Sequence, residues 1–103
     1  MSSDDAGAQR MAWGLDWLKA RAWFQEKLAG LPVETHIDAA GNSWITLTGD
    51  SSRTLVLGSH LDSVPNGGWL DGCLGVLTAL EVLRSISEEF KGRPPITVRL
   101  VDW

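Results

Sequence analysis

The chain has 103 residues, of which 44% are apolar, enough for one small domain with a hydrophobic core. Its formal net charge is −4, and no basic stripe is present that could neutralise phosphates, which argues against nucleic acid as a partner. It has one cysteine, Cys73, so no internal disulfide can form. No run approaches the roughly 20 apolar residues of a membrane span, and the polar N-terminus does not resemble a secretory signal, so we expect a cytoplasmic protein with no membrane partner.

The first part of the chain predicts a leader, a helix and a β-hairpin. Residues 1–10 are expected to form a loose leader. Residues 11–29 predict a helix, because apolar side chains recur at spacings of three and four. These side chains are Trp13, Trp17, Ala20, Phe24 and Leu28. Apolar and polar residues alternate over 33–38, and residues 43–48 predict a second strand after a short turn, so the two strands are expected to pair as a hairpin.

The second part predicts a strand–loop–helix–strand unit. Residues 54–57 form a continuous apolar run, which is typical of a strand covered on both faces. Residues 73–90 predict a helix whose wide apolar stripe packs against a sheet, and residues 96–101 predict another strand. The stripe consists of Leu74, Val76, Leu77, Leu80, Leu83, Ile86 and Phe90. Because such units form crossovers between parallel strands, we predict an α/β fold. The strand before Trp103 has no closing element, so we expect the chain to be part of a longer one.

The residues that carry chemistry lie in the glycine-rich loop between this strand and this helix. His60 and Asp62 follow the carboxyl end of the strand, where open α/β sheets place their ligand sites, and Asp71 stands at the start of the helix. One imidazole and two carboxylates make a partial site for a divalent metal. In an extended segment His60 and Asp62 point to the same side, so Asp62 can accept a hydrogen bond from the ring N–H that does not bind metal. From the residues alone, a solvated His-x-Asp pair and a helix-capping Asp71 are equally open readings.

The loop and the helix after it resemble the signature of a known group of zinc-dependent amidohydrolases, in the string GSHLDSVPNGGWLDGCLGVLTALEVL, residues 58–83. This group contains N-carbamoyl-L-amino-acid hydrolases, allantoate amidohydrolases and beta-ureidopropionases, and is a branch of the dinuclear zinc peptidase–aminoacylase family. The likeness extends upstream through the segments QRMAW and HIDAAGN and covers nearly all of residues 9–102. The motif is specific, because the histidine, both aspartates and the glycines fall at the spacing of the family.

The resemblance implies a three-layer, zinc-exopeptidase-like sheet flanked by helices. Residues 11–103 would be the N-terminal part of the catalytic metal-binding domain, without the rest of that domain and without the lid or dimerisation domain. The family pattern continues, after a strand like that over 96–103, into a Glu-Glu pair that supplies the general base and a metal ligand. That pair, the later ligands and the substrate-binding arginines are not in this sequence.

Carried over by position, the resemblance implies that His60 binds one metal, that Asp71 bridges two metals, and that Asp62 serves catalysis by orienting His60. The peptide between Asp71 and Gly72 is expected to be cis. The substrate loop would comprise Asn66, Gly67, Gly68 and Trp69. Trp69 and Leu70 stand where the family has Arg-Phe, which leaves the substrate preference open.

The function implied by the resemblance is the hydrolysis of carbon–nitrogen bonds other than peptide bonds, in small N-carbamoyl or ureido substrates such as N-carbamoyl-L-amino acids or allantoate. Two divalent metal ions would activate the attacking water, with zinc expected first and manganese, cobalt or nickel as alternatives. The full-length form is expected to be a homodimer, and the chain alone is expected to be inactive. Two alternatives stay open: a truncated, non-catalytic α/β module, and an aminoacylase or dipeptidase of the same family.

Overall fold

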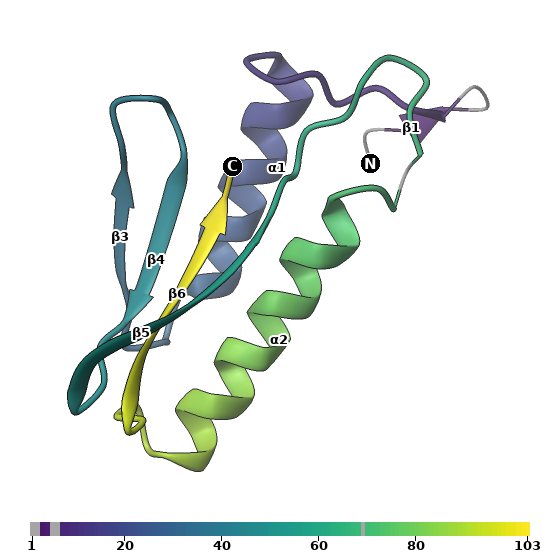
Figure 1. Cartoon of the computed structure of the whole chain (residues 1–103). Helices are drawn as coiled ribbons and strands as arrows, with labels where there is room; N and C mark the ends of the chain where they lie inside the picture. Colours follow the sequence, from purple (N-terminus) through teal and green to yellow (C-terminus); the bar gives the residue numbers. More distant parts are fainter. Residues whose placement is uncertain (1–2, 5–6, 69) are drawn as a thin grey trace.

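The computed structural model describes the chain except for residues 1–2, 5–6 and 69, so the expectation for Trp69 lies outside the described residues. Two short strands at the N-terminus are followed by two helices and a four-stranded sheet (Figure 1). In chain order the elements are β1 (Ser3–Asp4), β2 (Gly7–Ala8), α1 (Leu15–Leu28), β3 (Glu34–Ile37), β4 (Ser43–Leu47), β5 (Ser51–Ser59), α2 (Cys73–Glu89) and β6 (Ile96–Asp102). Among the described residues, no helix is long and apolar enough to span a membrane.

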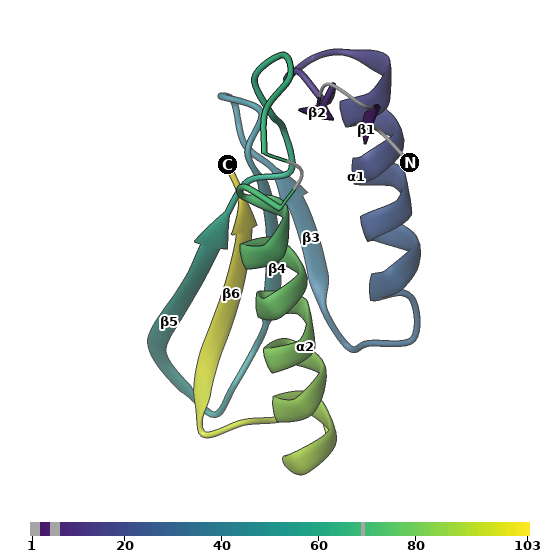
Figure 2. The ribbon, with the colours of Figure 1, turned by 90° about the vertical axis from the view of Figure 1, so that its right-hand side faces the viewer.

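The sheet has the strand order β3-β4-β6-β5. β3 pairs antiparallel with β4, which confirms the predicted hairpin, and β4 pairs antiparallel with β6. β5 and β6 are parallel and are joined through α2, which confirms the strand–loop–helix–strand unit. Figure 2 shows the four strands side by side, with β5 at one edge and β3 at the other. The α/β prediction is therefore confirmed.

Both helices pack on the same face of the sheet, to its right in Figure 1. Alternate residues of β4 and β6 point toward them, because successive side chains of a strand face opposite sides. A single buried cluster joins these residues to the helices: Ala20, Phe24, Leu28, Ile45, Leu47, Leu61, Val76, Ala79, Leu80, Leu83, Val98 and Leu100. The described elements therefore form two layers, with no described helix over the opposite face of the sheet.

The apolar stripes of the helices were only partly predicted. In α1 four of the five expected residues are buried, but Trp13 lies before the helix, has a φ of 68° and is exposed. In α2 the buried residues are Val76, Ala79, Leu80, Leu83 and Ser87. Leu74 and Phe90, at the two ends of the expected stripe, are exposed. The spacing of apolar residues therefore predicted the middle of the stripe and not its ends.

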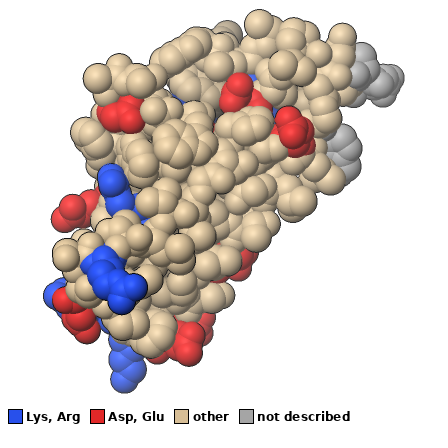
Figure 3. Space-filling view, in the orientation of Figure 1, with Lys and Arg blue, Asp and Glu red and all other residues tan. Residues whose placement is uncertain are grey.

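The expectation that residues 54–57 are covered on both faces is also wrong for this chain. They lie in β5, an edge strand, where Leu55 is 44% exposed and Val56 is 47% exposed. An apolar run reports the local preference for a buried strand, whereas burial depends on a neighbouring element that the described residues do not include. On the face shown in Figure 3, the Lys and Arg side chains gather at the lower left and form no continuous stripe.

Candidate metal centre

The candidate site lies at the carboxyl edge of the parallel pair. Ser59 is the last residue of β5 and is the register partner of Asp102, the last residue of β6. The loop that carries His60 and Asp62 leaves the sheet at this point and returns to the start of α2. The polypeptide thus places the predicted residues where parallel strands of an α/β sheet commonly bind ligands.

His60 lies between the two predicted carboxylates. Its Nδ1 is 3.2 Å from Oδ1 of Asp62 and 2.9 Å from the Asp62 carbonyl oxygen. Its Nε2 faces Asp71, with 3.9 Å to Oδ2. Two acceptors beside Nδ1 favour the neutral tautomer that carries its proton on Nδ1, and in this tautomer Nε2 presents a lone pair toward Asp71. The expected convergence of the imidazole and the Asp71 carboxylate is present.

The separation of these two groups suits a shared ion. Zinc lies about 2.0–2.2 Å from imidazole nitrogen and carboxylate oxygen, so two ligand atoms of a tetrahedral site lie roughly 3.4 Å apart. The 3.9 Å between Nε2 of His60 and Oδ2 of Asp71 is somewhat longer, so a shared ion requires a small shift of the Asp71 side chain. Asp71 is exposed and open to solvent. In the part of the chain that the structure describes, no three His, Cys, Asp or Glu side chains are grouped so that they could hold an ion.

Gly72 packs directly against the imidazole. A β-carbon at this position would come within 2.3–2.5 Å of the His60 ring atoms, and its φ of 69° is in the region that favours glycine. The hydroxyl of Ser59 donates to the carbonyl oxygen of Gly72 at 2.7 Å, which ties the end of β5 to the start of α2. All peptides among the described residues are trans, so the cis peptide expected between Asp71 and Gly72 is not present.

The predicted substrate loop is held by the N-terminal segment. The N–H of Ala8 donates to the Gly67 carbonyl at 2.8 Å, and the N–H of Gly67 donates back at 3.1 Å. The side chain of Gln9 bonds to both the backbone and the side chain of Asn66, which has a φ of 56°. Gly68 accepts from the N–H of Asp71 at 3.2 Å. Residues 7–10 are therefore part of the structured site region, which differs from the loose leader expected for 1–10.

Sequence reasoning missed a buried carboxylate beside the site. Asp102 is 0% exposed, and desolvation raises the pKa of its carboxyl, against the lowering effect of Arg21, whose Nε lies 2.8 Å from Oδ2. The available signal was an aspartate that directly follows the apolar pair Leu100 and Val101 at the end of a strand. A charged residue at such a position is buried only when it is paired.

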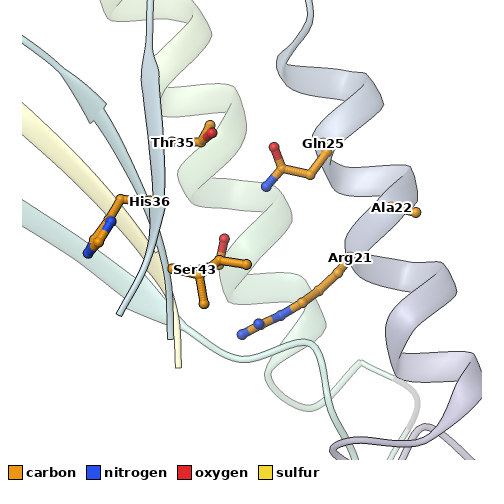
Figure 4. Close-up of a pocket in the computed structure, with 7 residues that line it drawn as sticks. Arg21, Ala22, Gln25, Thr35, His36 and Ser43 are labelled. Carbon is orange, nitrogen blue, oxygen red and sulfur yellow. The ribbon is translucent and has the colours of Figure 1, made fainter. Parts of the chain in front are cut away.

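A groove of about 250 Å³ lies away from this site, between α1 and the hairpin (Figure 4). Arg21 and Gln25 point from α1 toward the hairpin, whereas His36 points to the other side of β3. The lining residues are Arg21, Ala22, Gln25, Thr35, His36, Ile37 and Ser43. None of the predicted site residues lines the groove, and His36 is exposed, as the sequence predicted.

The α/β fold, with an imidazole and two carboxylates in the loop after β5, is the arrangement expected of a metal-dependent hydrolase, and the sequence comparisons agree with this class. Residues 42–103, more than half of the chain, match the model of peptidase family M28, and the chain belongs to this family. Its relatives include members of the hydantoinase/carbamoylase family, which confirms the resemblance seen in the loop and helix.

Three relatives illustrate this relationship. The chain is 34% identical over 102 residues to an allantoate amidohydrolase of Bacillus subtilis (strain 168), with 97% of this chain and 24% of the relative covered. It is 41% identical over 90 residues to an N-carbamoyl-L-amino-acid amidohydrolase of Pseudomonas sp. (strain NS671), covering 82% of the chain and 21% of the relative. A crystal structure of a hydantoinase/carbamoylase family amidase from Burkholderia vietnamiensis superposes with a TM-score of 0.88 at 30% identity, over 99% of this chain and 25% of that one. The chain thus spans about a quarter of the length of these relatives.

Proposed function

We propose that the chain supplies the first ligands of a dinuclear metal site in a hydrolase that cleaves carbon–nitrogen bonds other than peptide bonds. In this proposal His60 binds one ion through Nε2, Asp71 bridges two ions through its carboxylate, and Asp62 orients His60. Divalent ions, with zinc expected first, supply Lewis-acid chemistry when bound, which lowers the pKa of water and stabilises negative charge at the reacting carbonyl.

The observation that carries the proposal is the position of the His60 ring, which has Asp62 beside one nitrogen and the Asp71 carboxylate beside the other. Nδ1 lies beside Asp62, at 3.2 Å from Oδ1, and Nε2 faces Asp71 at 3.9 Å. A carboxylate behind the non-binding nitrogen of a metal-ligating histidine fixes its tautomer and raises its basicity. A solvated His-x-Asp pair, the alternative open at the level of sequence, does not require the second nitrogen to face another carboxylate.

The names of the relatives support the substrate class. The relatives above are called allantoate and N-carbamoyl-L-amino-acid amidohydrolases, and both names refer to a carbonyl flanked by nitrogen. We therefore propose small N-carbamoyl or ureido compounds as substrates, in preference to the N-acyl amino acids or dipeptides of an aminoacylase or dipeptidase.

The 103 residues alone are expected to be inactive. A catalytic zinc site needs about three protein ligands for each ion, and His60 and Asp71 provide two ligands between them. The general base that the family resemblance implies is not in this sequence. The activity is therefore proposed for a whole protein of which these residues form a part.

A chimera tests the proposal. The chain replaces the matching quarter of the Bacillus subtilis allantoate amidohydrolase, and the hydrolysis of allantoate and N-carbamoyl-L-amino acids is measured with and without added zinc or manganese. We expect metal-dependent turnover, which His60→Ala and Asp71→Ala abolish. His36→Ala is the matched control, because His36 is the other histidine of the chain and lies exposed on β3. A folded chimera whose turnover survives His60→Ala contradicts the proposed role.

A further inference from the structure

The buried carboxylate of Asp102 makes contacts with each of its two oxygens. Oδ1 accepts a hydrogen bond from the backbone N–H of Leu61 at 2.9 Å, and Oδ2 accepts one from Nε of Arg21 at 2.8 Å. The backbone N–H that follows Asp102, that of Trp103, donates to the carbonyl of Ser59 at 2.9 Å. The end of β6 therefore holds the chain on both sides of His60.

Arg21 is itself fixed by contacts along its whole guanidinium group. Besides the Asp102 carboxylate, it donates to the Asp102 carbonyl at 3.1 Å and to the carbonyl of Gly41 at 2.7 Å. Its Cζ lies 4.2 Å from the centre of the Trp17 ring. An arginine that is bound at all three nitrogens and stacked on an aromatic ring holds its partner carboxylate in one position, because little freedom is left in the side chain.

Leu61 connects the Asp102 carboxylate to the candidate metal site, because it lies between His60 and Asp62 and its N–H is bound to Asp102. Its side chain is 2% exposed and belongs to the core cluster, its N–H is bound to Asp102, and its carbonyl accepts from Nε of Arg10. The chain bends at Leu61, and the side chains on either side of it, His60 and Asp62, are 37% and 33% exposed and lie 3.2 Å apart. Anchoring Leu61 inward therefore directs His60 and Asp62 outward together.

We propose that the Arg21–Asp102 pair is a positioning device for the metal-binding segment. It acts through the backbone of Leu61, fixes the direction of the His60 and Asp62 side chains, and so maintains the 3.2 Å approach of Asp62 to Nδ1 of His60. In this role neither Arg21 nor Asp102 contacts the ion or the substrate. The consequence for metal affinity rests on the function proposed above, whereas the consequence for the orientation of His60 does not.

Asp102→Asn is the variant that tests this positioning role. The amide retains the shape of the carboxylate but has one acceptor oxygen, so it cannot accept from both Arg21 and Leu61 as the carboxylate does. Arg21→Lys is the milder second variant for the case that Asp102→Asn does not fold, because an ammonium group cannot reproduce the fork of contacts. Val98→Ala is the matched control, because Val98 is buried in the same strand as Asp102. This substitution is expected to lower the stability of the chain but leaves both hydrogen bonds of the Leu61 peptide groups in place.

The first measurement needs no metal. Hydrogen exchange of the Leu61 amide and the tautomer of the His60 ring are followed by nitrogen-15 NMR in the 103-residue chain. In Asp102→Asn we expect exchange at Leu61 to accelerate roughly tenfold or more relative to the amides of the β4–β6 ladder, because a charged hydrogen bond is lost. In the same variant we expect the His60 ring to populate both neutral tautomers. Val98→Ala is expected to change neither the relative exchange rate at Leu61 nor the tautomer of His60. An unchanged His60 tautomer in both Asp102→Asn and Arg21→Lys overturns the inference.

The second measurement adds zinc and separates this inference from the proposed function. We expect Asp102→Asn to weaken zinc binding roughly tenfold, as the loss of a residue that supports a metal ligand does. If the unaltered chain binds no zinc at His60 while its His60 tautomer still depends on Asp102, the proposed function fails and the positioning role stands. If zinc binds equally well to the unaltered chain and to Asp102→Asn, the positioning role fails and the proposed function stands.

Discussion

The α-carbon of Gly72 lies against the imidazole of His60, with no space for a side chain between the ring and the start of α2. A β-carbon at position 72 would meet the ring at 2.3 Å from Cε1, 2.4 Å from Nδ1 and 2.5 Å from Nε2. The glycine therefore sets how closely Asp71, its neighbour, approaches the histidine.

Gly72→Ala is expected to displace the His60 ring and to weaken zinc binding at least tenfold, as the loss of support for a metal ligand roughly does. The measurement is the zinc titration of both chains, with the His60 ring resonances as reporters. Gly30→Ala is the control, because Gly30 also has a positive φ, of 86°, but nothing lies within 4 Å of the added carbon. Both substitutions also strain the backbone, and the strain is greater at Gly72, whose φ of 69° and ψ of −48° lie near a conformation that is rare for residues with a side chain. Equal zinc affinity in the two variants contradicts the packing argument.

Ser59→Ala removes the hydroxyl that joins β5 to the Gly72 carbonyl. Because a hydrogen bond of this kind contributes about 0.5–1.5 kcal/mol, we expect the free energy of unfolding to fall by about 1 kcal/mol. Urea denaturation measures this change, with Ser85→Ala, at an exposed position of α2, as the comparison. A loss no larger than that of Ser85→Ala shows that the bond between strand and helix contributes nothing net.

Two leucines of the predicted α2 stripe allow a direct test of the core. Leu83 is fully buried, whereas Leu74 is exposed, although both belong to the same sequence pattern. Leu83→Ala is expected to cost about 2–5 kcal/mol, the usual range for a buried leucine, and Leu74→Ala less than about 0.5 kcal/mol. Thermal and urea unfolding compare the two variants. Similar losses would mean that Leu74 is buried in solution.

Asp38 gives the hairpin a defined dependence on pH. The indole N–H of Trp44, and then the side chain and backbone N–H of Asn42, lower the pKa of Asp38 to about 2 from its ordinary 3.8. A carboxyl whose pKa is lower in the folded state adds stability above its unfolded pKa, and this contribution is lost as the pH falls from about 4 to about 2.

The carboxyl carbon resonance of Asp38, followed against pH, measures this midpoint. Trp44→Phe removes the indole donor and is expected to raise the midpoint toward 3.8, because that bond is the largest cause of the shift. A midpoint that is the same in Trp44→Phe and in the unaltered chain contradicts this account of the turn.

The parts of the fold set by local pattern were predictable. The hairpin, the helix α2 and the parallel strands follow from the periodicity of apolar residues and from the turns between them. The exposure of Leu55, Leu74 and Phe90 was not predictable in this way, because burial depends on which other elements lie over a strand or helix. Trp13 fits the helical spacing, yet it lies outside α1 with a positive φ, and no periodicity reports this backbone conformation.

The candidate site was also predictable only in part. The spacing of His60 and Asp62 predicts that both point to one side, and the glycines around Asp71 allow the loop to return to them. The contacts of Asp102 and Arg21 were not visible in the sequence, because these residues are 81 positions apart and meet only when α1 docks beside β6. Gly72 was singled out only for the cis peptide expected before it, whereas the structure shows it packed against the imidazole.

The central claim, that Nε2 of His60 and the Asp71 carboxylate share an ion, is tested most directly by zinc titration of the chain labelled with nitrogen-15 in its histidine rings. The account predicts that zinc shifts the Nε2 resonance of His60 while Nδ1 keeps its proton, that Asp71→Asn removes this shift, and that His36 does not respond. A zinc shift that persists unchanged in Asp71→Asn, or that occurs only at His36, would contradict it.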